Sequence, residues 1–198
     1  MKIGLTGGIA SGKSTIANML VERGALLVDA DQVAREVVLP GESALEAIAS
    51  AFGQAVLETD GSLNRKKLGD IVFRDKASLK ALEAITHPAI RERMQDRIHT
   101  FEEQYPDRLV VADVPLLYET NQKHLYDGVM VVYVPSEVQI TRLMERNAVT
   151  EEEARRRVLL QMDIEQKRDL AEWVIDNSGT IEETERQIND FWKSQSLP

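Results

Sequence analysis

Residues 2–22 read KIGLTGGIASGKSTIANMLVE. Within them, residues 7–14 fit the pattern G-x-x-x-x-G-K-[ST], in which a glycine-rich loop binds phosphate groups. KIGLT reads as a short buried strand. Residues 14–22 read as a helix, because Ile16 and Leu20 are spaced as on one helical face. The alternative is a flexible glycine-rich turn. We favour a phosphate-binding loop, because strand, loop and helix in this order are what phosphate binding requires.

The loop and the helix after it can hold a nucleotide. Backbone N–H groups and the positive end of the helix dipole face the phosphates in such a site. Lys13 can reach the β- and γ-phosphates, and the hydroxyl of Ser14 can be a ligand of Mg²⁺. The stretch therefore predicts a nucleotide site that also uses Mg²⁺.

The composition fits one compact domain with room for subdomains, because the chain has 198 residues, of which 43% are hydrophobic. There is no cysteine, which excludes disulfides, thiolate metal sites and a cysteine nucleophile. The formal net charge of −9 argues against nonspecific binding of nucleic acid. An anionic small molecule can still bind wherever basic residues gather.

The sequence contains no segment that reads as a transmembrane helix or a signal peptide. A transmembrane helix needs about 18 apolar residues in a row. The phosphate loop occupies the place where the apolar part of a signal peptide would lie. We therefore expect no membrane partner and a location in the cytoplasm.

Five short apolar stretches read as buried parallel strands, and helical patterns separate them. They are residues 2–6, 25–29, 109–113, 129–134 and 173–176. In such sheets, ligands bind beyond the carboxyl ends of the strands. Four of these ends carry chemically active groups, which are the phosphate loop, Asp29 with Asp31, Asp113, and Asp176 with Asn177. The sequence therefore predicts an α/β fold built on a five-stranded parallel sheet.

Two further segments read as helical additions to the sheet. The interval 33–105 has no convincing strand, which predicts a helical insertion between the second and third strands. Thr150 and Glu153 fit a capping box, and three Glu–Arg pairs four residues apart follow, so we expect one solvated helix to about Leu170. The other predicted helices are 43–52, 65–73, 77–85 and 88–101 in the insertion, and 181–193 at the end.

Acidic residues at two strand ends are candidates for the chemistry. Asp113 stands where a second acid would help to hold Mg²⁺, directly or through water, and the alternative is an N-cap or turn aspartate. One carboxylate of Asp29 and Asp31 can accept a proton from an attacking hydroxyl, while the other caps the helix that begins near Gln32. We favour Asp31 as the base, and the residues themselves leave this choice open.

Arg142 and Arg146 lie four residues apart on one helical face, and neither has a carboxylate four residues away. Because two like charges side by side repel, an outside anion such as the phosphates of ATP suits them. The alternative is a solvated helix end. His87 precedes Pro88 at the expected start of a helix, where capping is the simpler interpretation. No histidine–carboxylate cluster indicates zinc.

Several motifs, in this order, resemble the dephospho-CoA kinase family over residues 1 to about 179. They are GLTGGIASGKST, VDAD, THP, DVPLLYE, RLMERN followed by EEEARRRVLLQM, and WVIDNSG. The phosphate loop is common to many proteins, whereas DVPLLYE and WVIDNSG are more specific. The resemblance implies a P-loop kinase fold and transfer of the γ-phosphoryl group of ATP to the ribose 3′-hydroxyl of dephospho-CoA. This reaction is the last step of coenzyme A synthesis.

The resemblance also implies roles for individual residues. Asp31 would be the catalytic base, assisted by Lys13 and Arg142. ATP would bind at Gly8, Ala10, Ser11, Gly12, Lys13, Ser14, Thr15, Arg142, Arg146 and Asn177. The acceptor would bind at Thr6, Asp31, His87, Leu116, Leu117, Tyr118 and Glu119. Mg²⁺ would be held by Ser14 and Asp113.

The same resemblance divides the chain into three parts. The core would comprise residues 1–32, 106–145 and 171–198, with a CoA-binding insertion at 33–105 and a lid at 146–170. Two departures from the family pattern are Asn147-Ala148-Val149 in place of an Asp-Gly-type turn, and Tyr118 where Phe is common. The expected partners are ATP and dephospho-CoA, and the sequence favours no particular oligomeric state.

The residues alone leave two other functions open. Another P-loop kinase could phosphorylate a different hydroxyl, such as that of a nucleoside or a sugar acid, because the insertion would set the specificity. A nucleotide-dependent switch or ATP sensor would bind a nucleotide without transferring phosphate. A GTPase switch would carry an N-K-x-D motif after a strand, and the sequence has none.

Overall fold

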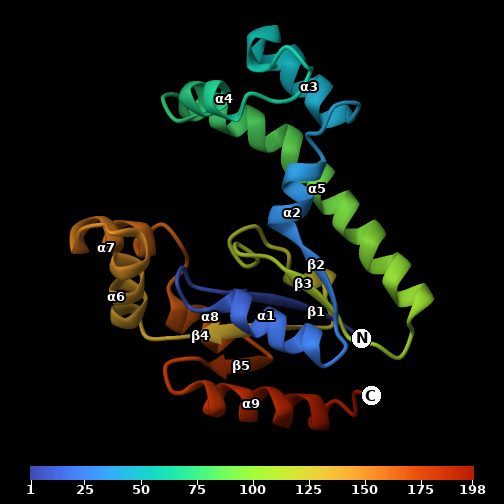
Figure 1. Ribbon diagram of the computed structural model, residues 1–198, viewed down its shortest axis with the longest axis vertical. Helices are drawn as coiled ribbons and strands as arrows, with labels where there is room; N and C mark the ends of the chain where they lie inside the picture. The colour runs from blue at the N-terminus through green and yellow to red at the C-terminus, as the bar shows by residue number, and fades with distance from the viewer. The chain divides into compact units, whose positions relative to one another are not determined.

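A computed structural model describes residues 1–198, and it contains the five-stranded parallel sheet that the sequence predicts (Figure 1). The strands are β1 (Lys2–Gly7), β2 (Leu26–Asp29), β3 (Val110–Asp113), β4 (Gly128–Tyr133) and β5 (Trp173–Asp176). Their order in the sheet is β2-β3-β1-β4-β5. Leu5 of β1 therefore has Asp113 of β3 on one side and Met130 of β4 on the other. The strand that leads into the phosphate loop is the central one.

Nine helices accompany the sheet, and four of them match the predicted bounds within one residue. They are α1 (Lys13–Glu22), α2 (Ala30–Glu36), α3 (Ser43–Phe52), α4 (Arg65–Val72), α5 (Lys76–Gln104), α6 (Ser136–Asn147), α7 (Glu151–Leu159), α8 (Ile164–Leu170) and α9 (Ile181–Ser194). The four close matches are α1, α3, α4 and α9. None of the helices combines the length and the apolar character that crossing a membrane requires.

The chain divides into two compact units. The first consists of residues 1–28 and 98–198 and holds nearly all of the sheet together with α1 and α6 to α9. The second consists of residues 29–97 and is helical, with α2, α3, α4 and most of α5. The bounds 33–105 for a substrate-binding insertion stay a prediction about function.

One face of the sheet is covered by α1 and α9. Ile3 and Leu5 of β1 are fully buried in this layer together with Ile16 of α1 and Ile188 of α9. The rings of Trp173 and Phe191 meet edge to face with their centroids 5.3 Å apart. Burial on this scale is the main favourable term in folding. It holds α1, which follows the phosphate loop, against the sheet.

The opposite face of β1 is covered by the segment that follows β3. A Cβ atom placed on Gly4 would lie 2.4 Å from Leu117 and 2.9 Å from Tyr126. Glycine is therefore needed at position 4 because this segment packs directly on the strand. The close approach brings residues 115–119 to the end of β1, next to the phosphate loop.

The prediction of two helices on either side of Pro88 was wrong, because α5 continues through the proline. Proline lacks the N–H that would bond to the carbonyl of Ala84, and it crowds the preceding turn. Leu82, Thr86 and Ile90 nevertheless line one cavity in the helical unit, at a spacing of four residues. These residues lie on both sides of Pro88, so one face of α5 stays continuous through the proline.

The prediction of one helix from Thr150 to Leu170 was also wrong, because α7 ends at Leu159 and α8 begins at Ile164. Thr150 caps α7 by accepting the N–H of Glu153. Asp163 caps α8 in the same way, by accepting the N–H groups of Glu165 and Gln166. A second N-cap inside the interval starts a new helix, as caps generally do.

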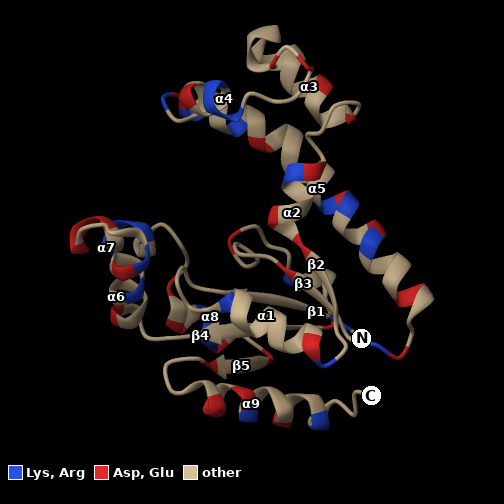
Figure 2. Ribbon diagram, in the orientation of Figure 1, with Lys and Arg blue, Asp and Glu red and all other residues tan.

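The charge pattern of α7 agrees in part with the prediction. The helix begins with acidic residues and carries basic residues in its last turn (Figure 2). Glu151 pairs with Arg155 and Glu153 pairs with Arg157. The expected third pair, between Glu152 and Arg156, does not form.

We expect Pro88→Ala to raise the free energy of unfolding, by about 1 to 3 kcal/mol, because it restores the N–H that α5 lacks. Urea denaturation followed by far-UV circular dichroism measures this change. Pro106→Ala is the matched control, since Pro106 lies outside the helices. Its removal should only increase the conformational entropy of the unfolded chain, which slightly lowers the free energy of unfolding. A loss of stability in Pro88→Ala equal to that of the control would contradict the prediction.

Candidate active site

The phosphate loop, residues 8–12, joins β1 to α1. Ala10 and Gly12 have positive φ angles of 61° and 86°. A non-glycine residue in this region is uncommon and strained, and the surrounding structure has to hold it in place. A Cβ atom on Gly12 would lie 2.2 Å from Nδ2 of Asn177. Glycine at position 12 therefore satisfies both the backbone angle and the close approach of Asn177.

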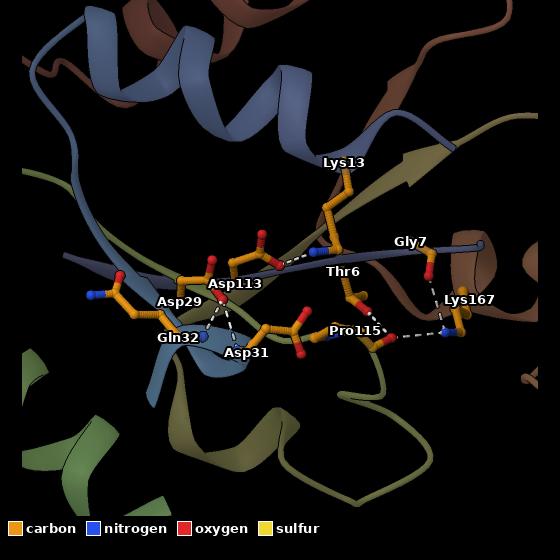
Figure 3. A network of polar contacts seen from close by, with 9 residues as sticks. All are labelled: Thr6, Gly7, Lys13, Asp29, Asp31, Gln32, Asp113, Pro115 and Lys167. Carbon is orange, nitrogen blue, oxygen red and sulfur yellow. Dashed lines mark hydrogen bonds and ion pairs between the residues drawn. The ribbon is translucent and has the colours of Figure 1, made fainter. Parts of the chain in front are cut away.

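The first half of the loop is held by two side chains that the sequence analysis did not select. Nζ of Lys167 donates to the carbonyl oxygen of Gly7 at 3.3 Å (Figure 3). The N–H of Ile9 donates to Oε1 of Gln161 at 2.7 Å. Lys167 lies in the sequence IEQKRDL, whose charged letters read as solvated surface, so no local signal separates it from its neighbours.

The second half of the loop is held by Asn177. Its Nδ2 donates to the carbonyl oxygen of Ser11 at 2.8 Å, and its Oδ1 accepts the hydroxyl of Thr184 at 3.1 Å. Its carbonyl oxygen also accepts a bond from Arg142 at 2.9 Å. Both ends of the Asn177 amide are thus engaged with the protein. This geometry suits support of the loop, in addition to the predicted contact with ATP.

Lys13 and Asp113 form an ion pair at the amino end of α1 (Figure 3). Their side chains are only 19% and 9% exposed. Asp113 is the last residue of β3 and stands opposite Leu5 of β1, so strand pairing brings it to the loop. Partial burial strengthens the attraction between the two charges. A cation and a carboxylate are therefore available side by side, where a phosphate and its metal ion would need them.

The residues present fit Mg²⁺ bound together with a nucleotide. Ser14 is exposed in the first turn of α1, and Asp113 supplies a carboxylate. Mg²⁺ prefers oxygen ligands and is commonly held by one or two carboxylates, substrate phosphates and water. No group of three or more His, Cys, Asp or Glu side chains is arranged to hold a metal ion by itself. The donors suit a cation that takes its other ligands from phosphate and water.

A cavity of about 690 Å³ opens beside the loop. Its volume lies within the usual range for small-molecule sites. Six of the residues predicted to bind ATP line it, namely Ala10, Gly12, Thr15, Arg142, Arg146 and Asn177. Three further lining residues, which the sequence analysis did not select, are Glu145, Gly179 and Ile181. The structure therefore brings together residues from the loop, from α6 and from the end of β5.

Neither arginine of this cavity forms an ion pair, although Glu145 also lines the cavity. Arg142 donates to the carbonyl oxygen of Asn177 at 2.9 Å, and Arg146 donates to Oδ1 of Asn147 at 2.9 Å. Both partners are neutral groups. The positive charges of the arginines therefore remain available to an anionic ligand.

The segment after β3 holds most of the residues predicted to contact the acceptor. The hydroxyl of Thr6 donates to the carbonyl oxygen of Pro115 at 3.0 Å (Figure 3). Leu117 is fully buried, whereas Leu116 is 42% exposed. The carboxylate of Glu119 pairs with Lys167 at 2.8 Å and accepts the N–H of Met162 at 2.9 Å. Their contact with an acceptor stays a prediction.

Asp29, Asp31 and His87 belong to the helical unit. Asp29 caps α2, because its Oδ1 accepts the N–H groups of Asp31 at 2.7 Å and of Gln32 at 3.2 Å. Asp31 is exposed in the first turn of α2, two residues after β2 ends. His87 is exposed within α5. It is therefore not the helix cap that the simpler interpretation of the sequence assigned to it.

A model of the dephospho-CoA kinase family matches residues 1–183. The chain belongs to the dephospho-CoA kinase family. A dephospho-CoA kinase from Shouchella clausii is 48% identical to it over 190 residues, which cover 96% of each protein. The solved structure of dephospho-CoA kinase from Campylobacter jejuni superimposes with a TM-score of 0.77 at 30% identity, covering 99% of this chain and 98% of the other.

The fold extends beyond the family. Shikimate kinase from Bacteroides thetaiotaomicron matches with a TM-score of 0.51 at 12% identity, covering 100% of this chain and 99% of the other. At this identity the likeness concerns the fold alone, which is that of the P-loop kinases.

The hydroxyl of Tyr118 is buried without a hydrogen-bond partner. Burial, with a smaller contribution from the negative charge of Glu172, raises the pKa of Tyr118 to about 12. The unfolded tyrosine ionises near pH 10. Between about pH 10 and pH 12 the unfolded chain therefore loses the phenol proton while the folded protein keeps it. The contribution of this group to the free energy of unfolding is constant below about pH 10 and falls as the pH rises to about 12.

We expect Tyr118→Phe to raise the free energy of unfolding at neutral pH, by about 1 kcal/mol, because it removes an unpaired buried hydroxyl. The decline in stability from pH 10 to pH 12 should also be shallower than in the wild type. Denaturant unfolding across this pH range measures both effects. Tyr105→Phe, at a residue that is 43% exposed, is the control and should change neither. Destabilisation at neutral pH would contradict the prediction.

Proposed function

We propose that this chain transfers the γ-phosphoryl group of ATP to the ribose 3′-hydroxyl of dephospho-CoA, giving CoA and ADP. Membership of the dephospho-CoA kinase family supports phosphorylation of dephospho-CoA with ATP as the last step of coenzyme A biosynthesis. The observation that carries the proposal is the pair of Lys13 and Asp113 at the phosphate loop, next to the cavity with two free arginines.

Phosphoryl transfer depends mainly on positioning and on charge neutralisation. In this proposal the N–H groups of residues 12–14 bind the β-phosphate, and Lys13 exchanges part of its contact with Asp113 for the β- and γ-phosphates. Arg142 and Arg146 bind the remaining phosphate charge from α6. The hydrogen bonds of both arginines go to neutral groups, which supports this assignment. The exposed Ile181 gives the cavity an apolar surface that suits the adenine ring of ATP.

Mg²⁺ would be held by Ser14 and by Asp113, directly or through water. When bound, it would reduce the negative charge of the phosphates. Lys13 keeps Asp113 oriented through their ion pair, so the carboxylate is already in position when ATP arrives. This assignment rests on the donor types of the two residues and on the ion pair.

The proposed base is Asp31, which would accept the proton of the 3′-hydroxyl as that oxygen attacks the γ-phosphorus. The hydrogen bonds of Asp29 support this choice, because its Oδ1 already accepts two N–H groups as the cap of α2. Asp31 is exposed and is not part of that cap. The carboxylate of Asp31 is therefore the freer of the two.

Dephospho-CoA would bind through residues 33–105 as the acceptor-binding insertion. His87 and the residues Thr6 and Leu116 to Glu119 would lie near the acceptor. Residues 146–170 would act as a lid that excludes water and so prevents hydrolysis of ATP. The exposed Leu159 and Leu160, at 82% and 79%, support a surface on this segment that is covered during the reaction cycle.

The test of the reaction is incubation of the purified protein with ATP, Mg²⁺ and dephospho-CoA, followed by mass spectrometry. We expect a product one phosphoryl group heavier than dephospho-CoA, and we expect none without Mg²⁺. Lys13→Ala should abolish turnover, because it removes the charge that stabilises the transferring phosphoryl group. Lys193→Ala, at an exposed lysine of α9, is the control and should keep the wild-type rate.

Two results would redirect the proposal. Near-normal turnover in Lys13→Ala would remove the phosphate-loop assignment. ATP binding without a phosphorylated product would point to another hydroxyl acceptor or to an ATP sensor. A panel of nucleosides and sugar acids would separate these two functions.

We expect Asp31→Asn to lower kcat by about 10²- to 10⁴-fold, because asparagine cannot accept the proton of the hydroxyl. Asp29→Asn is the matched control, since asparagine caps a helix as well as aspartate does, and its kcat should stay close to the wild-type value. Steady-state kinetics with both substrates varied measures this. If Asp31→Asn raised only the KM for dephospho-CoA, Asp31 would be a binding residue and the base would have to be sought elsewhere.

A further inference from the structure

Lys167 is a charged side chain without solvent exposure. It has a relative exposure of 0% and is the largest of the fully buried side chains. Removing an ammonium group from water costs several kcal/mol unless partners replace the water. Three oxygens do so. One is Oε1 of Glu119 at 2.8 Å. The others are the carbonyl oxygens of Gly7 at 3.3 Å and Pro115 at 3.4 Å, and Figure 3 shows these two contacts. The lysine therefore joins three segments of the chain.

Two of these three oxygens belong to backbone next to the reacting groups. Gly7 is the last residue of β1 and leads into the phosphate loop. Pro115 lies two residues after Asp113, the partner of Lys13. The buried ammonium group therefore holds the backbone at both of these positions. A shift of the ammonium group would thus affect the backbone that leads to Lys13 and the backbone that follows Asp113.

Gln161 makes a second contact with the same stretch of the loop. Its Oε1 accepts the N–H of Ile9 at 2.7 Å, two residues after the carbonyl that Lys167 binds. Between them stands Gly8, where a Cβ atom would lie 1.6 Å from Nε2 of the buried Gln139. The backbone of residues 7–9 is therefore confined on both sides of Gly8. Residues 161–167, which connect α7 to α8 and begin α8, supply both contacts.

The loop needs such confinement because its geometry is strained. Ala10 follows Ile9 directly and has a φ angle of 61°. Strained backbone of this kind persists only when the surrounding structure fixes it. The N–H groups that would face phosphate come after this residue. A shift at Ile9 would consequently change the direction in which those N–H groups point.

We propose that Lys167 and Gln161 are positioning residues for phosphoryl transfer. They fix Gly7 and Ile9, and through them the orientation of the phosphate loop and of Lys13. Because both side chains come from the 161–167 segment, they also connect the loop to the end of the predicted lid. This inference rests on the proposed phosphoryl transfer, and neither residue is assigned a contact with substrate.

The expected effect follows from the sensitivity of phosphoryl transfer to geometry. A misplacement of about 1 Å, even one caused far from the chemistry, can lower the rate about 100-fold. We expect Gln161→Leu and Lys167→Met to lower kcat by about 10- to 100-fold at saturating ATP and dephospho-CoA. The KM for dephospho-CoA should stay close to the wild-type value. Each variant keeps the approximate side-chain volume and removes only the polar contacts.

The control for the buried lysine is Lys123→Met. Lys123 pairs with Glu172 at 2.7 Å and donates to the carbonyl oxygen of Leu170, but its side chain is 43% exposed. It has no contact with the phosphate loop. This variant should keep kcat, because exposed ion pairs contribute little and the loop is untouched. Circular dichroism and thermal melts identify a temperature at which the variants under assay are folded, and kinetics are measured there.

Gln161→Leu decides the inference even if Lys167→Met does not fold, because Gln161 is only partly buried. A folded Gln161→Leu variant with the wild-type kcat would overturn the proposal. A rise in the KM for dephospho-CoA at unchanged kcat would also overturn it, because both residues would then act in acceptor binding. If the wild-type protein itself produced no phosphorylated CoA, the proposed reaction would fail first, which is a separate outcome.

Discussion

The site depends on a backbone loop that must direct its N–H groups toward a phosphate. A loop in this conformation leaves other backbone groups without partners in regular structure, and such groups need hydrogen bonds when they are buried. Here the carbonyl of Gly7, the N–H of Ile9 and the carbonyl of Ser11 are each bound by a side chain. The three side chains belong to residues 161–177, more than 145 positions away. The phosphate-binding motif therefore depends on the last quarter of the chain.

Sheet topology explains how such distant residues reach the loop. Because β1 is central, β3 on one side brings Asp113 to Lys13, and the end of β5 brings Asn177 to Ser11. The helix α8 precedes β5 directly and places Lys167 beside Gly7. Parallel strands align their carboxyl ends at one edge of the sheet, where ligands of such folds bind. The same order that buries the apolar strands thus assembles the charged groups.

The sequence predicts those features whose signal is local. Buried parallel strands are apolar runs, and all five were found on that basis. Pro88 misled the prediction because a proline is a local signal for a helix break, whereas α5 continues through it. Lys167 and Gln161 were missed because their partners in the loop, Gly7 and Ile9, lie more than 150 positions away in the sequence. In a charged stretch of sequence, nothing distinguishes a buried charged residue from its exposed neighbours. Only the structure could therefore identify Lys167 and Gln161 as contacts of the loop.

Charge placement explains how a chain of net charge −9 can hold a polyphosphate. Lys167 contributes little to the attraction, because Glu119 neutralises it at 2.8 Å. Arg142 and Arg146 have only neutral partners, so their charges act on whatever occupies the adjacent cavity. Electrostatic interactions between exposed charges fade over about 10 Å in salt solution. In the proposed reaction, the local arginines would therefore govern affinity for phosphate, and the buried lysine would act through the shape of the loop.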